Sequence, residues 1–220
     1  MKFFQILFLS LILQACMSKS KDGAMMAQSQ VSVPKPDLTS MEKAYFASGC
    51  FWCVEAVFES VLGVAEVVSG YAGGSAKDAN YELVSAGSTD HAEAVEIYYD
   101  PKVVSFETLL QVFFDSHDPT TKDRQGPDAG RQYRSAIFYR NESEKAQSEK
   151  YIKSLYDDGV FRPGSISTEL TPFDAFYPAE SYHQDFEKRN PNHPYIRNVS
   201  IPRLKRFESK RPELLKKESH

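Results

Sequence analysis

Hydrophobic and polar positions change their period several times between residues 41 and 210. Short apolar or alternating runs typical of strands are KAYFAS, VAEVVSGYAGG, HAEAVEIYYDP, RSAIFYR and SISTELTPF. Helices are predicted for WCVEAVFESV, FETLLQVFFDSH, ESEKAQSEKYIKSLYDDG and PAESYHQDFEKR, with Ser105 and Asn141 as N-caps. Strands that alternate with helices through one unit predict an α+β fold, in which helices pack on a mixed sheet.

The first sixteen residues, MKFFQILFLSLILQAC, predict an export signal. Lys2 precedes an apolar run over residues 3–13 that is too short to cross a bilayer as a permanent helix. The end of this segment, Leu13 to Cys16, resembles the lipobox of bacterial lipoproteins. That resemblance implies a signal peptide over residues 1–15 and acylation of Cys16. Ordinary secretion, with Cys16 discarded, is the alternative.

Composition predicts how the rest of the chain is divided into segments. Residues 16–40 are rich in Ser, Lys, Gln and Pro and lack an apolar period. This predicts a flexible tether, followed by a domain over residues 41–210 and a charged tail over 211–220. A lipid on Cys16 would hold the domain at a bacterial membrane, in the cell envelope or periplasm. The formal net charge of -4 argues against nucleic acid as the main partner.

The heptad GCFWCVE, residues 49–55, holds the other two cysteines and the single tryptophan of the chain. A disulfide between Cys50 and Cys53 would close too short a loop to stabilise the fold much. The chain has neither a second CxxC nor an HxxxH spacing, so no metal site is expected. The Cys50–Cys53 pair therefore indicates thiol chemistry.

Cys50 is predicted to be a nucleophile, because a strand meets a helix at this residue. Backbone N–H groups and the dipole at a helix N-terminus favour a thiolate. A buried structural cysteine is the alternative. Phe51 and Trp52 follow directly, and two large aromatic side chains beside a nucleophile predict an apolar substrate pocket, although core packing is the usual role of such a pair.

Acidic and phenolic side chains elsewhere could complete such a site. Glu93 shares a period-two face with Val95 and Ile97, so its carboxyl is expected to be partly desolvated and suited to general acid catalysis near neutral pH. A strand end already in solvent is the alternative. The polar loop over residues 118–133 is long for a compact domain and carries Asp128 and Tyr133, which fit either a site or a surface turn.

Five segments, taken in order, resemble the A-type peptide methionine sulfoxide reductases over Lys43 to Phe207. They are GCFWCVEAVF, GYAGG, NYELVSAGSTDHAEAVEIYYDP, HDPTTKDRQGPDAGRQYRSAIFY and YHQDF. The resemblance implies a ferredoxin-like α/β sandwich with extended irregular termini. It also implies a monomeric enzyme without a cofactor, which reduces the S epimer of methionine sulfoxide, free or in oxidised proteins.

The resemblance gives each candidate residue a role. Cys50 would attack the sulfoxide sulfur, and Glu93 would protonate the sulfoxide oxygen. The apolar wall that receives the substrate methyl group would be Phe51 and Trp52. The groups that hydrogen-bond the oxygen or order water beside it would be Tyr81, Asp128 and Tyr133.

The proposed cycle leaves Cys50 as a sulfenic acid, which another thiol has to resolve. The tail PYIRNVSIPRLKRF contains no cysteine, so Cys53 is the internal candidate, through a disulfide with Cys50 that a thioredoxin-like dithiol reduces. Two other functions remain open at this point. One is a protein thiol–disulfide oxidoreductase, and the other is a lipid-anchored module that binds through Phe51 and Trp52 without turnover.

Overall fold

The computed structural model describes residues 37–217 of the 220-residue chain. The predicted export signal, Cys16 and nearly all of the predicted tether lie outside the described residues. Within residues 37–217, no helix combines the length and the apolar character that crossing a membrane requires.

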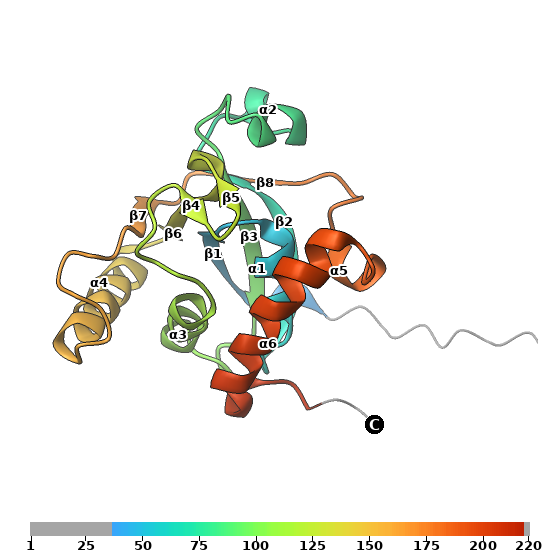
Figure 1. The fold of residues 1–220 in the computed structure, drawn as a ribbon. Coiled ribbons are helices and arrows are strands. Elements are labelled where there is room, and N and C mark those ends of the chain that lie inside the picture. Colours follow the sequence, from blue (N-terminus) through green and yellow to red (C-terminus); the bar gives the residue numbers. More distant parts are fainter. Residues whose placement is uncertain (1–36, 218–220) are drawn as a thin grey trace, which may run out of the picture. The chain divides into compact units, whose positions relative to one another are not determined.

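Two sheets contain all of the strands found in residues 37–217. The strands are β1 (Glu42–Ser48), β2 (Val64–Ala72), β3 (Ala92–Tyr99), β4 (Arg124–Gln125), β5 (Asp128–Ala129), β6 (Ser135–Tyr139), β7 (Glu169–Pro172) and β8 (Phe176–Pro178). The larger sheet has six strands in the order β7-β6-β1-β3-β2-β8, and β4 pairs with β5 in a small hairpin (Figure 1). Neighbours in the larger sheet are antiparallel except β6 and β7, which makes the sheet mixed.

The described residues also form six α-helices. They are α1 (Phe51–Glu59), α2 (Tyr81–Ser85), α3 (Phe106–Ser116), α4 (Glu142–Asp157), α5 (Phe186–Arg189) and α6 (Ile201–Lys210). Short 3₁₀ turns are η1 (Leu38–Ser40), η2 (Ala76–Asp78), η3 (Arg131–Tyr133) and η5 (Pro212–Leu214), and η4 (Ile196–Ser200) is a turn of π-helix. The predicted caps are confirmed, because the side chains of Ser105 and Asn141 accept hydrogen bonds from the third residues of α3 and α4.

The connections follow the ferredoxin-like pattern that the sequence resemblance implied. The chain runs through β1, α1, β2, β3, α3 and β6, and the four strands lie in the antiparallel order β6-β1-β3-β2. The helices α1 and α3 pack on one face of this sheet, and α6 packs across both of them (Figure 1). The predicted α+β class with helices on a mixed sheet is confirmed.

Aromatic side chains fill the space between the helices and the sheet. The ring of Phe46 on β1 lies 5.5 Å from that of Phe58 on α1 and 5.1 Å from that of Phe113 on α3. All three are fully buried, so this contact fixes the start of α1 relative to β1. A smaller apolar cluster covers the opposite face of the sheet, where Tyr45 stacks on Phe173 at 3.8 Å.

The C-terminal quarter differs from the sequence expectation. The helix predicted for PAESYHQDFEKR is reduced to α5, because Asp185 has a φ of 53°, which interrupts the helical path. Helix α6 was not predicted, and neither was β8. Residues 211–215, assigned to the charged tail, belong to the packed fold: Leu215 forms a bridge with Val61, and the N–H of Lys216 donates to the carbonyl of Ser60 over 2.8 Å.

Candidate active site

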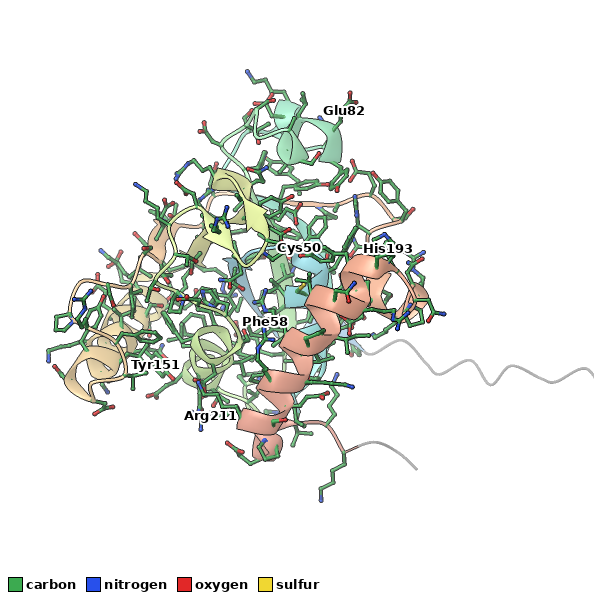
Figure 2. All side chains as sticks on the ribbon, in the orientation of Figure 1. Cys50, Phe58, Glu82, Tyr151, His193 and Arg211 are labelled. Atoms are coloured by element: carbon green, nitrogen blue, oxygen red, sulfur yellow. The ribbon has the colours of Figure 1, made fainter. Side chains whose placement is uncertain are left out.

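Cys50 lies at the junction between β1 and α1 (Figure 2). Gly49 precedes it with a φ of 91°, and a Cβ at that position would come within 2.6 Å of the Cβ of Gln125, so the turn requires glycine. Cys50 then forms the N-cap of α1 with a φ of -53° and a ψ of 125°. Its residue surface is only 7% exposed. The predicted strand-to-helix junction at the cysteine is confirmed.

The carboxyl of Glu93 lies against the first turn of α1. Strand β3 runs in the middle of the sheet, and Glu93 is only 2% exposed. Its Oε2 accepts a 3.0 Å hydrogen bond from the backbone N–H of Phe51, the residue after Cys50. Burial raises the pKa of Glu93 to about 8, against the opposing effect of that hydrogen bond. The predicted desolvation is confirmed, and the carboxyl is protonated at neutral pH.

The two thiols influence each other's protonation. Burial raises the pKa of the Cys50 thiol well above its usual value, and the hydrogen bond to Cys53 and the charges of Cys53 and Glu93 act in the same direction. The hydrogen bond from Cys50 lowers the pKa of Cys53 to about 7, and the charge of Arg203 contributes to this shift. These opposite shifts favour loss of a proton from Cys53 before Cys50.

The direction of the Cys50 pKa shift is opposite to the one that the helix position alone predicts. The first N–H group of α1 donates to the carboxyl of Glu93, and the N–H of Trp52 lowers the pKa of Cys50 by less than burial raises it. Burying a charged sulfur costs more free energy than the dipole at the helix N-terminus contributes in stabilisation. Deprotonation of Cys50 therefore has to accompany its reaction.

The two aromatic residues after Cys50 have different environments. Phe51 is 1% exposed, with its ring 4.9 Å from that of His183. Trp52 is half-buried and stacks on Phe186 with a centroid distance of 3.8 Å and an interplanar angle of 8°. Its Nε1–H donates to Nδ1 of His183 over 3.1 Å. The indole is therefore held from both its face and its edge, as a wall of a pocket requires.

The other predicted site residues lie around Cys50 and Glu93 and come from separate elements. Tyr81 begins α2, Tyr133 ends η3, and Asp128 lies in the β4–β5 hairpin. Burial is the main cause that raises the pKa of each phenol, and the charges of Glu93 and Cys50 add to it. Both phenols therefore remain protonated and can donate hydrogen bonds beside the thiol and the carboxyl.

Residues from the last quarter of the chain complete the surroundings of Cys53. The hydroxyl of Tyr195 lies 3.8 Å from Sγ of Cys53 and donates to Oδ2 of Asp128 over 2.5 Å. Arg203 on α6 is 6% exposed and contributes to the electrostatics of Cys53. Neither residue was predicted. The sequence analysis placed both residues in the domain over residues 41–210 without a role.

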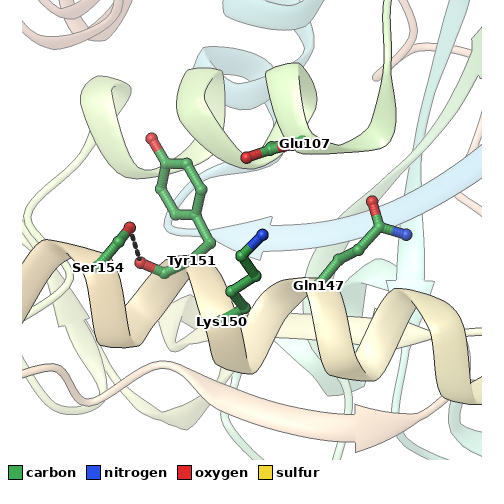
Figure 3. Close-up of a pocket in the computed structure, with 5 residues that line it drawn as sticks. All are labelled: Glu107, Gln147, Lys150, Tyr151 and Ser154. Atoms are coloured by element: carbon green, nitrogen blue, oxygen red, sulfur yellow. Dashed lines mark hydrogen bonds between the residues drawn. The ribbon is translucent and has the colours of Figure 1, made fainter.

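Two other features of the structure do not belong to this site. A cavity of about 110 Å³ between α3 and α4 contains none of the predicted residues; it is lined by Glu107, Gln147, Lys150, Tyr151 and Ser154 (Figure 3). Among the described residues, one acidic group could hold a metal ion, formed by Glu55, Glu59 and Asp185. Nζ of Lys188 already lies 2.7 Å from Glu59 and 2.9 Å from Asp185, so a lysine supplies the positive charge there.

Comparison with known sequences identifies the family. Residues 42–215 match the model of the family described as peptide methionine sulfoxide reductase. The chain is 52% identical over 179 residues to the peptide methionine sulfoxide reductase MsrA 2 of Synechocystis sp., which covers 81% of this chain and 83% of the relative. It is 48% identical over 176 residues to the peptide methionine sulfoxide reductase MsrA of Acinetobacter baumannii, over 80% of this chain and 99% of the relative.

Solved structures with the same fold support this assignment. Reduced Mxr1 of Saccharomyces cerevisiae aligns with a TM-score of 0.66 at 33% identity, over 72% of this chain and 91% of that one. Methionine sulfoxide reductase A of Corynebacterium diphtheriae aligns with a TM-score of 0.62 at 34% identity, over 70% and 77% of the two chains. With the junction cysteine, the buried carboxyl and the aromatic wall in place, the chain belongs to the A-type peptide methionine sulfoxide reductase family and reduces methionine sulfoxide by thiol chemistry.

Proposed function

We propose that this reductase acts on the S epimer of methionine sulfoxide, free or within oxidised proteins, with Cys50 as nucleophile and Glu93 as general acid. The observation that carries the proposal is the hydrogen bond between Glu93 and the N–H of the residue after Cys50. It holds a protonated carboxyl against the turn that presents the thiol. A sulfoxide oxygen leaves sulfur poorly unless it is protonated, so the acid has to act beside the nucleophile.

The first step transfers oxygen from the substrate to Cys50. The Cys50 sulfur attacks the sulfoxide sulfur, and its proton passes to the thiolate of Cys53. Glu93 gives a proton to the oxygen. The S–O bond of the substrate and the new bond between the two sulfurs then break as the oxygen moves to Cys50, which becomes a sulfenic acid. The methionine sulfur gains two electrons and the Cys50 sulfur loses two. Glu93 is left as a carboxylate.

The aromatic wall and the two phenols suit a methyl sulfoxide. Trp52 is held rigidly by Phe186 and His183 and offers an apolar face for the methyl group. Tyr81 and Tyr133 remain protonated, so their hydroxyls can donate to the sulfoxide oxygen or to a water beside it. A thiol–disulfide oxidoreductase would not need donors arranged around an oxygen atom.

Cys53 is proposed to resolve the sulfenic acid. It lies one helical turn after Cys50, and its backbone N–H donates to the carbonyl of Cys50 over 3.1 Å, which places the two side chains at the same turn. Attack of the Cys53 sulfur on the Cys50 sulfur forms the S–S bond and breaks the S–O bond. The hydroxyl leaves as water with the Cys53 proton. A thioredoxin-like dithiol then reduces the disulfide, and no other cofactor enters the cycle.

Separate assays of the two epimers test the proposed substrate. Purified protein with dithiothreitol is expected to convert a peptide containing the S sulfoxide to the methionine form and to leave the R sulfoxide unchanged, since such reductases act on one epimer each. Mass spectrometry measures the loss of one oxygen. A disulfide-containing peptide without a sulfoxide serves as control. Faster consumption of the R epimer, or reduction of the disulfide peptide alone, would contradict the proposal.

We further propose that the protein is an exported lipoprotein that repairs oxidised proteins of the cell envelope. Support comes from the apolar run over residues 3–13 and from the lipobox-like sequence that ends at Cys16. The match to the family model covers residues 42–215, so the preceding segment lies outside the part that the chain shares with the family. The anchor would be firm, because each buried CH₂ of an acyl chain contributes about 0.8 kcal/mol.

Cys16→Ala is expected to abolish acylation without loss of reductase activity. The variant should move from the detergent phase to the aqueous phase in a phase-partition experiment and lack the mass of the lipid. Light scattering is expected to show a monomer. A variant that still enters the detergent phase, at the mass of the acylated protein, would exclude Cys16 as the lipid site.

A further inference from the structure

Arg203 is a buried cation without a carboxylate partner among the described residues. Its Nε donates to the carbonyl of Ser116 over 2.7 Å, and its Nη1 and Nη2 donate to the carbonyl and hydroxyl of Ser48 over 2.9 and 3.0 Å. All three acceptors are neutral, and the side chain is 6% exposed. Burying a charge in this way is costly unless negative charge lies nearby.

The hydrogen bonds of Arg203 place it beneath the turn that carries the thiols. Ser48 is the last residue of β1, two residues before Cys50. A Cβ added to Gly49 would lie 3.7 Å from Nη1 of Arg203, which shows how closely the guanidinium approaches this turn. Helix α6 also packs directly on α1. The cation is thus fixed to the same backbone that positions Cys50 and Cys53.

Asp115 and Asp118 line the same pocket as Arg203 but form no salt bridge with it, because Asp115 pairs with Lys210 and Arg211 and Asp118 accepts hydrogen bonds from Thr120. Other ionisable groups also lie around Arg203. His117 is neutral, because burial lowers its pKa to about 3 and the charge of Arg203 adds to this. Burial raises the pKa of Tyr195, so its phenol stays protonated. Burial also raises the pKa of Asp128, against the hydrogen bond from Tyr195 and the charge of Arg203. Arg206 is a second cation and is exposed.

We propose that the guanidinium of Arg203 is the counter-charge of the resolving sulfur. It stabilises negative charge on Cys53 and so accelerates the attack of Cys53 on the Cys50 sulfenic acid. This inference rests on the proposed role of Cys53 and adds the residue that activates it. Arg203 is a positioning residue, since it acts on the reaction through Cys53 and touches neither substrate nor reacting oxygen.

Removing the charge while keeping the shape tests the role of Arg203. Arg203→Met should still release one methionine per molecule from excess sulfoxide without reductant, which also reports that the site is folded. Its sulfenic acid, trapped with dimedone at timed intervals, should persist about 10-fold longer at pH 7. The midpoint of disulfide formation against pH should rise by about one unit, which corresponds to the same factor. Arg203→Lys keeps the charge and should restore the wild-type midpoint.

Arg206→Met is the matched control, because it removes an exposed positive charge from the same helix. Its resolution rate and midpoint should equal those of the wild type. If Arg203→Met does not fold, Arg203→Gln, which keeps polar donors for the two serines, carries the same expectation. If the midpoint of disulfide formation in Arg203→Met equals that of the wild type, the role of Arg203 is overturned. The same holds if the midpoint of Arg203→Lys is raised as far as that of Arg203→Met. Wild type that releases methionine but never forms a disulfide would overturn both this role and that of Cys53. Failure to release methionine would instead contradict the proposed substrate.

Discussion

Cys50→Ser is expected to lower the rate of methionine formation by at least about 10⁴-fold, since removal of a nucleophile eliminates the covalent step. Serine occupies nearly the same volume, so the buried N-cap position and the contacts of α1 should persist. The free thiol of Cys53 should still react with an alkylating reagent in this variant. Single-turnover assays with a sulfoxide peptide measure the effect. Substantial activity in Cys50→Ser would remove this residue from the mechanism.

Cys53→Ser provides the matched comparison for the other thiol. The same single-turnover assay should yield one methionine per molecule, while the Cys50 sulfenic acid remains available to dimedone. Wild type should lose two free thiols after one turnover. The serine variant should recycle poorly with thioredoxin-like donors and still turn over with excess dithiothreitol. A stable, dimedone-reactive sulfenic acid in wild type, without an internal disulfide, would show that Cys53 is not the resolving residue.

Glu93→Gln is expected to slow the first oxygen transfer by about 10²- to 10⁴-fold, the usual contribution of a placed general acid. The glutamine oxygen can still accept the hydrogen bond from the N–H of Phe51, so the first turn of α1 keeps its position. Alkylation of Cys50 should therefore continue in the variant. Loss of alkylation together with activity would indicate misfolding. A near-normal rate would exclude Glu93 as the acid.

The pH dependence of oxygen transfer provides a second measure of the same group. Because burial raises the pKa of Glu93 to about 8, the acid form is present below this value and is lost as the pH rises through it. The wild-type rate should fall above about pH 8, and Glu93→Gln should lack this decrease. The folded chain also binds this proton more tightly than the unfolded chain does, so deprotonation destabilises the fold. Glu93→Gln should therefore be at least as stable as wild type above pH 8.

Local sequence patterns predicted those parts of the fold that are determined by contacts between residues close together in the sequence. The strand that ends at Gly49, the helix after it and the caps Ser105 and Asn141 could all be predicted, because their signals are alternation, helical spacing and side chains that bind nearby N–H groups. The burial of Glu93 followed from the apolar side chains that share its strand face. These features depend on a few consecutive residues.

Features set by distant residues could not be predicted in this way. The protonation of Cys50 depends on Glu93, Cys53 and burial together, and these raise its pKa, whereas the helix position alone predicts a lowered one. Helix α6 has an average composition close to that of a solvated tail, with one buried arginine and one buried phenylalanine as its inner side. In the sequence, Arg203 cannot be told from a surface arginine. Only the folded structure places Ser48 and Ser116 beside it.

The order in which the chain is synthesised gives the Arg203 contact a further consequence. Ser48 and Arg203 are 155 residues apart, so the ribosome makes nearly the whole chain before this contact can form. Contacts of large sequence separation carry a greater loop-closure cost than local contacts and need the whole intervening chain. During biogenesis the CxxC motif therefore exists for a period without its counter-charge. A chain that ends before helix α6 contains Cys50 and Cys53 but lacks Arg203, so it carries the redox pair without the assembled reductase site.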